Sequence, residues 1–125
     1  MTYKLVASNF ELCLEIDEDS YSHFPAIQFD CLLNNRQLFQ MLPEQGAGHW
    51  KLLADACRGR TNYSIDWSPC NGESNINVSG NDVTFCVAKF GDGCGGQLSV
   101  TVPSEACVEA FEHAAQITTE WMQKK

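Results

Sequence analysis

Residues Asn75 to Met122 read NINVSGNDVTFCVAKFGDGCGGQLSVTVPSEACVEAFEHAAQITTEWM, and this stretch decides the fold. In its first part apolar residues alternate with polar ones, which is the period of a β-strand with one buried face. Three such runs follow one another, and their apolar members are Ile76 and Val78, then Val83, Phe85 and Val87, then Leu98, Val100 and Val102. The stretch therefore predicts a meander of three strands that needs a cover on one face.

The end of the same stretch predicts the helix that supplies this cover. Pro103 stops the last strand, Ser104 is a favoured N-cap, and Glu105 suits the positive end of a helix. The apolar residues then recur at helical spacing, in a stripe formed by Cys107, Ala110, Phe111, Ala114, Ile117, Thr118 and Trp121. A helix of about 19 residues is roughly 28 Å long, enough to cross several strands.

Alternation predicts further strands before this stretch, at Tyr3–Ser8, Phe10–Asp17, Phe24–Leu33 and Thr61–Asp66. The segment Arg36–Leu42 fits a short helix as well as a strand. A short helix is expected over His49–Arg58, with Gly59 as its C-cap.

These elements predict a single α+β domain over residues 1–125. We expect a mainly antiparallel sheet, with the long C-terminal helix packed across one face and the short helix near Trp50. The row of Phe111 and Ile117 should then bury the row of Phe85, Val87 and Val100.

Composition and charge narrow the function classes. The chain has 125 residues, with 16 acidic against 8 basic ones and a net charge of -8. This charge disfavours binding to nucleic acid or to an anionic membrane and allows a basic protein partner. No apolar run reaches the length of a membrane span, and no signal peptide is evident, so the sequence predicts a cytoplasmic protein.

Seven cysteines are the unusual feature of the composition. In a reducing cytosol we expect free thiols, and Cys31, Cys86 and Cys107 are expected to be buried as small apolar residues. No two cysteines have the close spacing of a zinc site, so we expect no metal.

The glycine-rich segment Gly91–Gly96 formally matches G-x-G-x-x-G. A dinucleotide site needs a helix after this motif, but a strand follows here, so a hairpin is predicted and no cofactor is expected. Cys94 is the thiol that we expect to be most exposed. It is a candidate reactive cysteine, although no histidine lies beside it in sequence and an inert loop thiol is favoured.

A row of carboxylates is the main candidate binding site. Glu11, Glu15 and Asp17 share one face of a predicted strand, and Asp30 joins them from a neighbouring strand. A solvated face is the first interpretation, a surface for a basic partner the second, and a catalytic dyad the third.

The tryptophans and the catalytic motifs are the last sequence features to consider as candidate functional sites. Trp50 and Trp121 lie on apolar helix stripes and are expected in the core. Trp67 stands in a polar stretch and is a candidate interface anchor. No nucleophile elbow, P-loop or H-E-x-x-H motif is present, so no catalytic residue is assigned.

The segment Asn81–Phe111, NDVTFCVAKFGDGCGGQLSVTVPSEACVEAF, resembles stretches of small orphan bacterial proteins, of the immunity type or encoded by mobile gene cassettes. The likeness is one of style, namely an acidic domain with a glycine hairpin and a strand–Pro–helix ending. It covers about a quarter of the chain. The resemblance implies an accessory binding protein rather than a housekeeping enzyme, and it assigns no site residue.

Three functional hypotheses follow. The first is a non-enzymatic protein that uses its acidic surface to bind a basic protein. The second is a small enzyme or ligand binder with a pocket between sheet and helix. The third is a homodimer paired through a strand edge or the Trp67 region.

Overall fold

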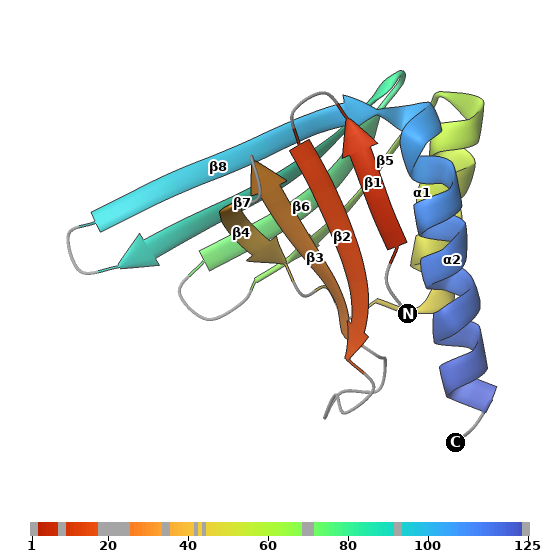
Figure 1. Cartoon of the computed structure of the whole chain (residues 1–125). Coiled ribbons are helices and arrows are strands. Elements are labelled where there is room, and N and C mark those ends of the chain that lie inside the picture. Colours follow the sequence, from red (N-terminus) through yellow and green to blue (C-terminus); the bar gives the residue numbers. More distant parts are fainter. Residues whose placement is uncertain are drawn as a thin grey trace.

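The computed structural model describes residues 3–7, 10–17, 26–33, 36–41, 43, 45–68, 72–91 and 94–123. Four strands and a helix are followed by four further strands and a second helix (Figure 1). The elements of the first half are β1 (Tyr3–Ala7), β2 (Phe10–Asp17), β3 (Ala26–Leu33), β4 (Arg36–Met41) and α1 (Ala47–Gly59). Those of the second half are β5 (Asn62–Trp67), β6 (Gly72–Ser79), β7 (Asp82–Gly91), β8 (Cys94–Pro103) and α2 (Ser104–Gln123).

The strands form two antiparallel sheets, in the orders β1-β2-β3-β4 and β5-β6-β7-β8. The α+β class and the long C-terminal helix are therefore confirmed. The sequence did not indicate the division into two sheets, which leaves each half with its own sheet and helix. Arg36–Met41, which fitted either helix or strand, is the edge strand β4.

The second sheet shows how alternation produces a buried and an open face. On the inner face, three rows of facing residues cross all four strands, and the one at the end of β5 is Trp67–Ser74–Val87–Leu98. The other two carry an apolar or aromatic residue on every strand, and they are Tyr63–Val78–Val83–Val102 and Ile65–Ile76–Phe85–Val100. All side chains of these other two rows are buried except that of Tyr63, which is half-buried against the core. Because successive strand residues point to opposite faces, the polar residues between them lie on the outside.

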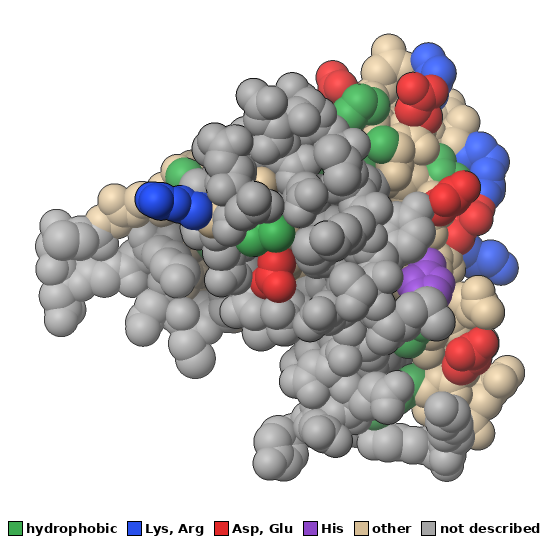
Figure 2. Space-filling view, viewed as in Figure 1, with side chains coloured by type: hydrophobic (Ala, Val, Ile, Leu, Met, Phe, Trp, Pro, Cys, Tyr) green, Lys and Arg blue, Asp and Glu red, His purple; other side chains and the backbone are tan. Residues whose placement is uncertain are grey.

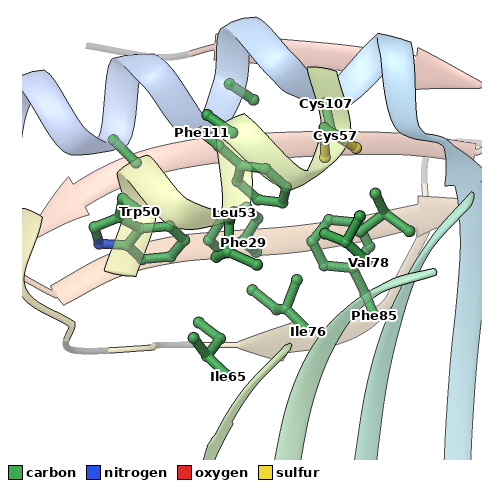
Figure 3. Close-up of a cluster of buried hydrophobic side chains, with 14 of the residues drawn as sticks. Phe29, Trp50, Leu53, Cys57, Ile65, Ile76, Val78, Phe85, Cys107 and Phe111 are labelled. Atoms are coloured by element: carbon green, nitrogen blue, oxygen red, sulfur yellow. The ribbon is translucent and has the colours of Figure 1, made fainter. Parts of the chain in front are cut away.

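Four aromatic rings join the two halves at the centre of the core. Phe29 of β3 lies 5.8 Å from Trp50 of α1 and 5.6 Å from Phe85 of β7 between ring centroids. Phe111 of α2 closes the circuit at 6.1 Å from Trp50 and 6.3 Å from Phe85 (Figure 3). Such separations are favourable for aromatic pairs. The expected contact between the C-terminal helix and the sheet row is thus made by Phe111 on Phe85.

The two helices lie against each other at one side of the sheets (Figure 1). α1 is longer than the sequence indicated, since it begins at Ala47 and includes Gly59. The expectation that Gly59 caps it is wrong: Arg60 adopts the left-handed conformation with φ 55°, and Thr61 N–H donates to the Ala56 carbonyl. A glycine is favoured at this position but is not required, because the left-handed region costs a non-glycine residue only about 1–2 kcal/mol.

The start of α2 is tied to the turn between β6 and β7. The hydroxyl of Ser104 donates to the Gly80 carbonyl at 2.8 Å, and its N–H donates to the Asn81 carbonyl at 2.7 Å. The Gly80 N–H in turn donates to the Thr61 carbonyl at 3.2 Å. Gly80 has φ 62°, which a two-residue hairpin turn needs and which glycine adopts without strain.

Candidate functional site

The outer face of the second sheet is an ordered array of polar side chains, and we call it the polar face. It consists of three rows of facing residues: Ser64–Asn77–Thr84–Thr101, Asp66–Asn75–Cys86–Ser99 and Glu73–Ala88–Gln97. The residues of the edge strands β5 and β8 are exposed, while those of the central strands β6 and β7 are half-buried by their neighbours, except Glu73, which is exposed. Antiparallel sheets commonly have one solvated face of this kind.

Hydrogen bonds between strands hold several of these side chains in place. Asn75 Nδ2 donates to Asp66 Oδ1 at 2.7 Å, and the Thr84 and Thr101 hydroxyls lie 3.0 Å apart. Gln97 Nε2 donates to Cys86 Sγ at 3.1 Å. Cross-strand polar pairs like these orient donors and acceptors at a sheet surface, so a partner meets a partly ordered array.

A shallow pocket of about 330 Å³ opens at the end of β5 and extends onto the polar face. Asp66 and Glu73 supply two carboxylates to its lining, and Ala88 contributes a short side chain. Trp67 and Ser74 also reach the pocket, although they belong to the inner row of the sheet. The pocket can accept a polar or cationic side chain, because its charged groups are both acidic.

The charge of the polar face is negative. Asp66 and Glu73 are exposed on it, and Asp82 is exposed at the start of β7 on the same side. None of the side chains described on this face is a lysine or an arginine. A face of neutral hydrogen-bonding groups with acidic residues beside them repels phosphate and attracts cations.

The helical side of the molecule differs, because it carries charges of both signs (Figure 2). There a groove of about 450 Å³ runs between the helices, and its lining includes Lys51, Asp55, Arg58, Glu112 and Gln116. Arg58 pairs with Asp55 within α1 and with Glu112 across the groove. Arg58 is thus close to two acidic groups, which reduces the net electrostatic field of the groove.

The predicted carboxylate row falls largely outside the described side chains. Glu11, Glu15 and Asp17 lie on β2, whose backbone is described but whose side chains are not. The register places Cys13 opposite Asp30, so the backbone positions of the row share one side of the first sheet with Asp30. Asp30 itself is half-buried and makes contacts of its own.

The other predicted residues lie at the far end of the second sheet from the helices. Trp67 is the last residue of β5, half-buried against the core and lining the shallow pocket. Cys94 is the first residue of β8 and pairs with Gly91, and its side chain lies outside the described part. A strand does follow the glycine-rich segment, as the rejection of the dinucleotide motif required.

Two cysteines behave differently from each other. Cys86 was expected to be buried but is half-buried on the polar face, because the buried face of β7 is filled by Val83, Phe85 and Val87. Cys107 is buried as expected, close to Cys57 of α1 (Figure 3).

Burial governs the chemistry of this internal pair. Loss of solvation raises the pKa of Cys57 from 9.0 to about 11. The pKa of Cys107 is raised further, first by burial and then by the neighbouring Cys57. Both thiols therefore stay protonated at neutral pH and are poor nucleophiles there.

Sequence reasoning missed the polar face although a signal was present. Asn75, Asn77, Thr84 and Cys86 occupy the positions between the apolar residues on which the strand prediction rested. The pairing of these strands with β5 and β8 collects the polar positions into rows, and pairing register is not readable from one strand alone.

Two negative findings apply to the described part of the chain. No group of three or more histidine, cysteine, aspartate or glutamate residues there is arranged to hold a metal ion. No described helix has the length and apolar character needed to cross a membrane.

The fold is similar to two solved structures over nearly the whole chain. The structure of the plant transcriptional regulator PBF-2 matches with a TM-score of 0.63 and 11% identity, covering 99% of this chain and 85% of the other. The crystal structures of Trypanosoma bruciei MRP1/MRP2 match with a TM-score of 0.53 and 8% identity, covering 98% and 84%. At such identities the similarity shows a shared fold, and folds host many functions.

No curated protein matches the chain significantly in sequence. Residues 39–113, which run from β4 through the second sheet into α2, match a family of unknown function, DUF5766. This match spans more than half of the 125 residues, and the chain therefore belongs to DUF5766.

Proposed function

We propose that the protein is a non-enzymatic binding module that docks a basic protein on the polar face. The observation that carries the proposal is the composition of this face, where ordered neutral hydrogen-bonding side chains adjoin three exposed carboxylates, Asp66, Glu73 and Asp82. Polar interfaces of moderate affinity use such groups for orientation and charge for partner choice.

Electrostatics supports a basic partner over an acidic one. The net charge of -8 gives a negative field around the molecule, and the described polar face adds no cation to oppose it. Association with a basic protein should therefore be fast at low salt and should slow as salt screens the field.

The proposal is tested by affinity capture from a lysate of the source organism, with matched baits. The double variant Asp66→Lys, Glu73→Lys reverses two charges on the polar face. The control variant Glu105→Lys, Glu120→Lys makes the same change of net charge on exposed residues of α2. A partner retained by the wild type and the control bait, but lost from the polar-face bait and released by salt, supports the proposal.

The captured protein is then purified and its affinity measured. We expect the polar-face variant to bind at least about tenfold more weakly than the control variant, a difference of about 1.4 kcal/mol. If both variants lose affinity for the captured protein equally, then net charge alone, and not the polar face, determines binding. Equal retention with both would refute the polar face as the docking surface.

A second candidate function is regulation of transcription, which the similarity to PBF-2 favours. PBF-2 is a plant transcriptional regulator, and its fold matches 99% of this chain. The acidic charge argues against contacts with a phosphate backbone. Filter binding of labelled single-stranded and double-stranded DNA and RNA at low salt distinguishes transcription regulation from protein docking. Retention of nucleic acid that is lost at higher salt would favour this second function.

A further inference from the structure

The strand β8 forms an edge of the second sheet and has one unpaired side. It pairs with β7 over ten residues, from Asp82↔Pro103 to Gly91↔Cys94, without a register shift. No described strand pairs with its other side, which we call the free edge. Gly95 to Ser99 and Thr101 are exposed, and the hairpin of β7 and β8 extends away from the helices (Figure 1).

The register identifies the backbone groups of the free edge. The turn Gly80–Asn81 is a two-residue hairpin loop that closes on the pair Ser79↔Asp82, so this pair is hydrogen-bonded. Backbone groups alternate in direction along an antiparallel strand, so Val83 and every second residue after it bond to β8. Their partners on β8 are the even-numbered residues from Cys94 to Val102. The N–H groups of Gly95, Gln97, Ser99 and Thr101 therefore point to the free edge.

This edge lacks the features by which proteins usually prevent strand pairing. Natural edge strands are protected by short length, lysines, prolines, bulges or a covering element. β8 has ten residues, no charged residue and a regular register, and its proline is the last residue, Pro103. A long regular edge without charge is the kind of surface that accepts an additional strand.

We propose that the free edge of β8 pairs with an extended segment of the basic partner, which adds a fifth strand to the second sheet. The inference rests on the proposed function, since it specifies how the same partner is held. Charge complementarity selects this occupant over a second copy of the chain, because two chains of net charge -8 repel each other. The backbone then supplies affinity, and the neighbouring polar face supplies selection for positive charge.

The pairing is tested with two synthetic peptides of twelve residues and six lysines. One alternates Lys and Thr and favours strands, while the other contains Ala and Lys and favours a helix. We expect the wild-type protein to bind the Lys–Thr peptide at least about tenfold more tightly than the Ala–Lys peptide. We also expect the Lys–Thr peptide to slow amide hydrogen exchange at Gly95, Gln97, Ser99 and Thr101 selectively.

Two variants of one residue isolate the backbone contribution. Ser99→Pro removes an edge N–H without breaking a β7–β8 bond, and proline is tolerated at such edge positions. Ser99→Ala keeps the N–H and removes the same hydroxyl from the polar face, so a difference between the two variants reports the backbone N–H. We expect Ser99→Pro to bind the Lys–Thr peptide more weakly than Ser99→Ala does and to lose the preference for it over the Ala–Lys peptide. If Ser99→Pro does not fold, the amide hydrogen exchange of the wild type with the Lys–Thr peptide tests strand pairing on its own.

The outcomes separate this inference from the proposed function. Equal affinity for both peptides, or protection outside the four edge amides, overturns strand pairing, even where the charge-reversal baits still distinguish the partner. The four edge amides could instead be protected from hydrogen exchange in the absence of peptide, to a degree that rises with protein concentration. This result would identify a second copy of the chain as the occupant of the free edge. Edge protection by the peptide together with equal retention on all three baits would support pairing and refute the polar face.

Discussion

Phe85 is one of the four aromatic residues at the centre of the core. Its ring is 1% exposed and touches one aromatic ring from each half of the chain, Phe29 and Phe111. Cores are packed as densely as crystals, so a ring lost here leaves a cavity that the surrounding strands and helices cannot close.

We expect Phe85→Ala to lower the free energy of unfolding by roughly 3–5 kcal/mol. Phe85→Leu keeps most of the volume and should cost less than half as much. Urea unfolding followed by circular dichroism measures both, with Ser99→Ala on the open face as a control that should change stability by less than about 0.5 kcal/mol. A loss below about 1 kcal/mol for Phe85→Ala would contradict the central position of this ring.

Cys57 couples the core to pH. Its thiol has a pKa of about 11 in the folded protein, raised by burial from 9.0. The folded state therefore holds its proton at a pH where the unfolded state has released it. The stability linked to this group is fully present below pH 9 and is lost as the pH rises toward 11.

We expect the free energy of unfolding to fall by about 2–3 kcal/mol between pH 9 and 11 through this thiol. Cys57→Ala should show a correspondingly shallower decline, because it removes the titrating group and keeps a small apolar side chain. Urea titrations at several pH values compare the two slopes. Identical slopes would show that Cys57 is not desolvated in solution.

The helix pair is the element that joins the halves on the outside of the sheets. Its buried side includes Trp50 and Leu53 from α1 and Phe111 from α2, all without exposed surface. Its open side carries the ion pair of Arg58 and Glu112, whose side chains are 57% and 46% exposed. Exposed ion pairs contribute about 0–1 kcal/mol, so the apolar contacts should dominate.

We expect Arg58→Ala to cost less than about 1 kcal/mol and Leu53→Ala about 2–5 kcal/mol, both measured by urea unfolding. Raising the salt concentration should reduce the Arg58→Ala effect further, since exposed charges are screened. A larger cost for the arginine than for the leucine would mean that charge rather than packing holds the helices together.

At the scale of elements, alternation within a strand was readable from the sequence, and so was the helical stripe that ends the chain. The structure of Arg36–Met41 was not readable, because Leu38, Phe39 and Met41 fit the helical period as well as the strand period in so short a segment. The left-handed cap at Arg60 was missed because glycine is the more frequent residue in that conformation, and Gly59 stood beside it.

The candidate site was harder to predict than the fold. Asp66 and Glu73 are far from Gln97 in sequence and meet only through the pairing of β5, β6, β7 and β8. The division of the eight strands into two sheets likewise depends on which strands pair. No residue pattern at Arg60–Thr61, just before the second sheet begins, indicated this division.

At the scale of the whole molecule, the two sheets share one core. Buried residues from β3, β4, α1, α2 and the second sheet form a single cluster, with no separate core for either half among the described residues. Domains with one contiguous core generally unfold in one step.

We therefore expect urea unfolding curves from tryptophan fluorescence and from circular dichroism to coincide. Trp50 reports on the centre of the core, and circular dichroism reports on both sheets and both helices. Separate midpoints would show that the halves unfold independently, in spite of the rings that join them.

The circuit of four aromatic rings has a consequence for the history of this family. Its corners occupy equivalent places, since Phe29 and Phe85 come from the third strand of each sheet and Trp50 and Phe111 from the helix after it. Replacement of one of these residues by a smaller one leaves a cavity that only a larger side chain at a neighbouring position of the four can fill. We therefore expect the three positions within the matched residues 39–113, Trp50, Phe85 and Phe111, to covary among DUF5766 sequences, each half of the chain having evolved as the other's complement.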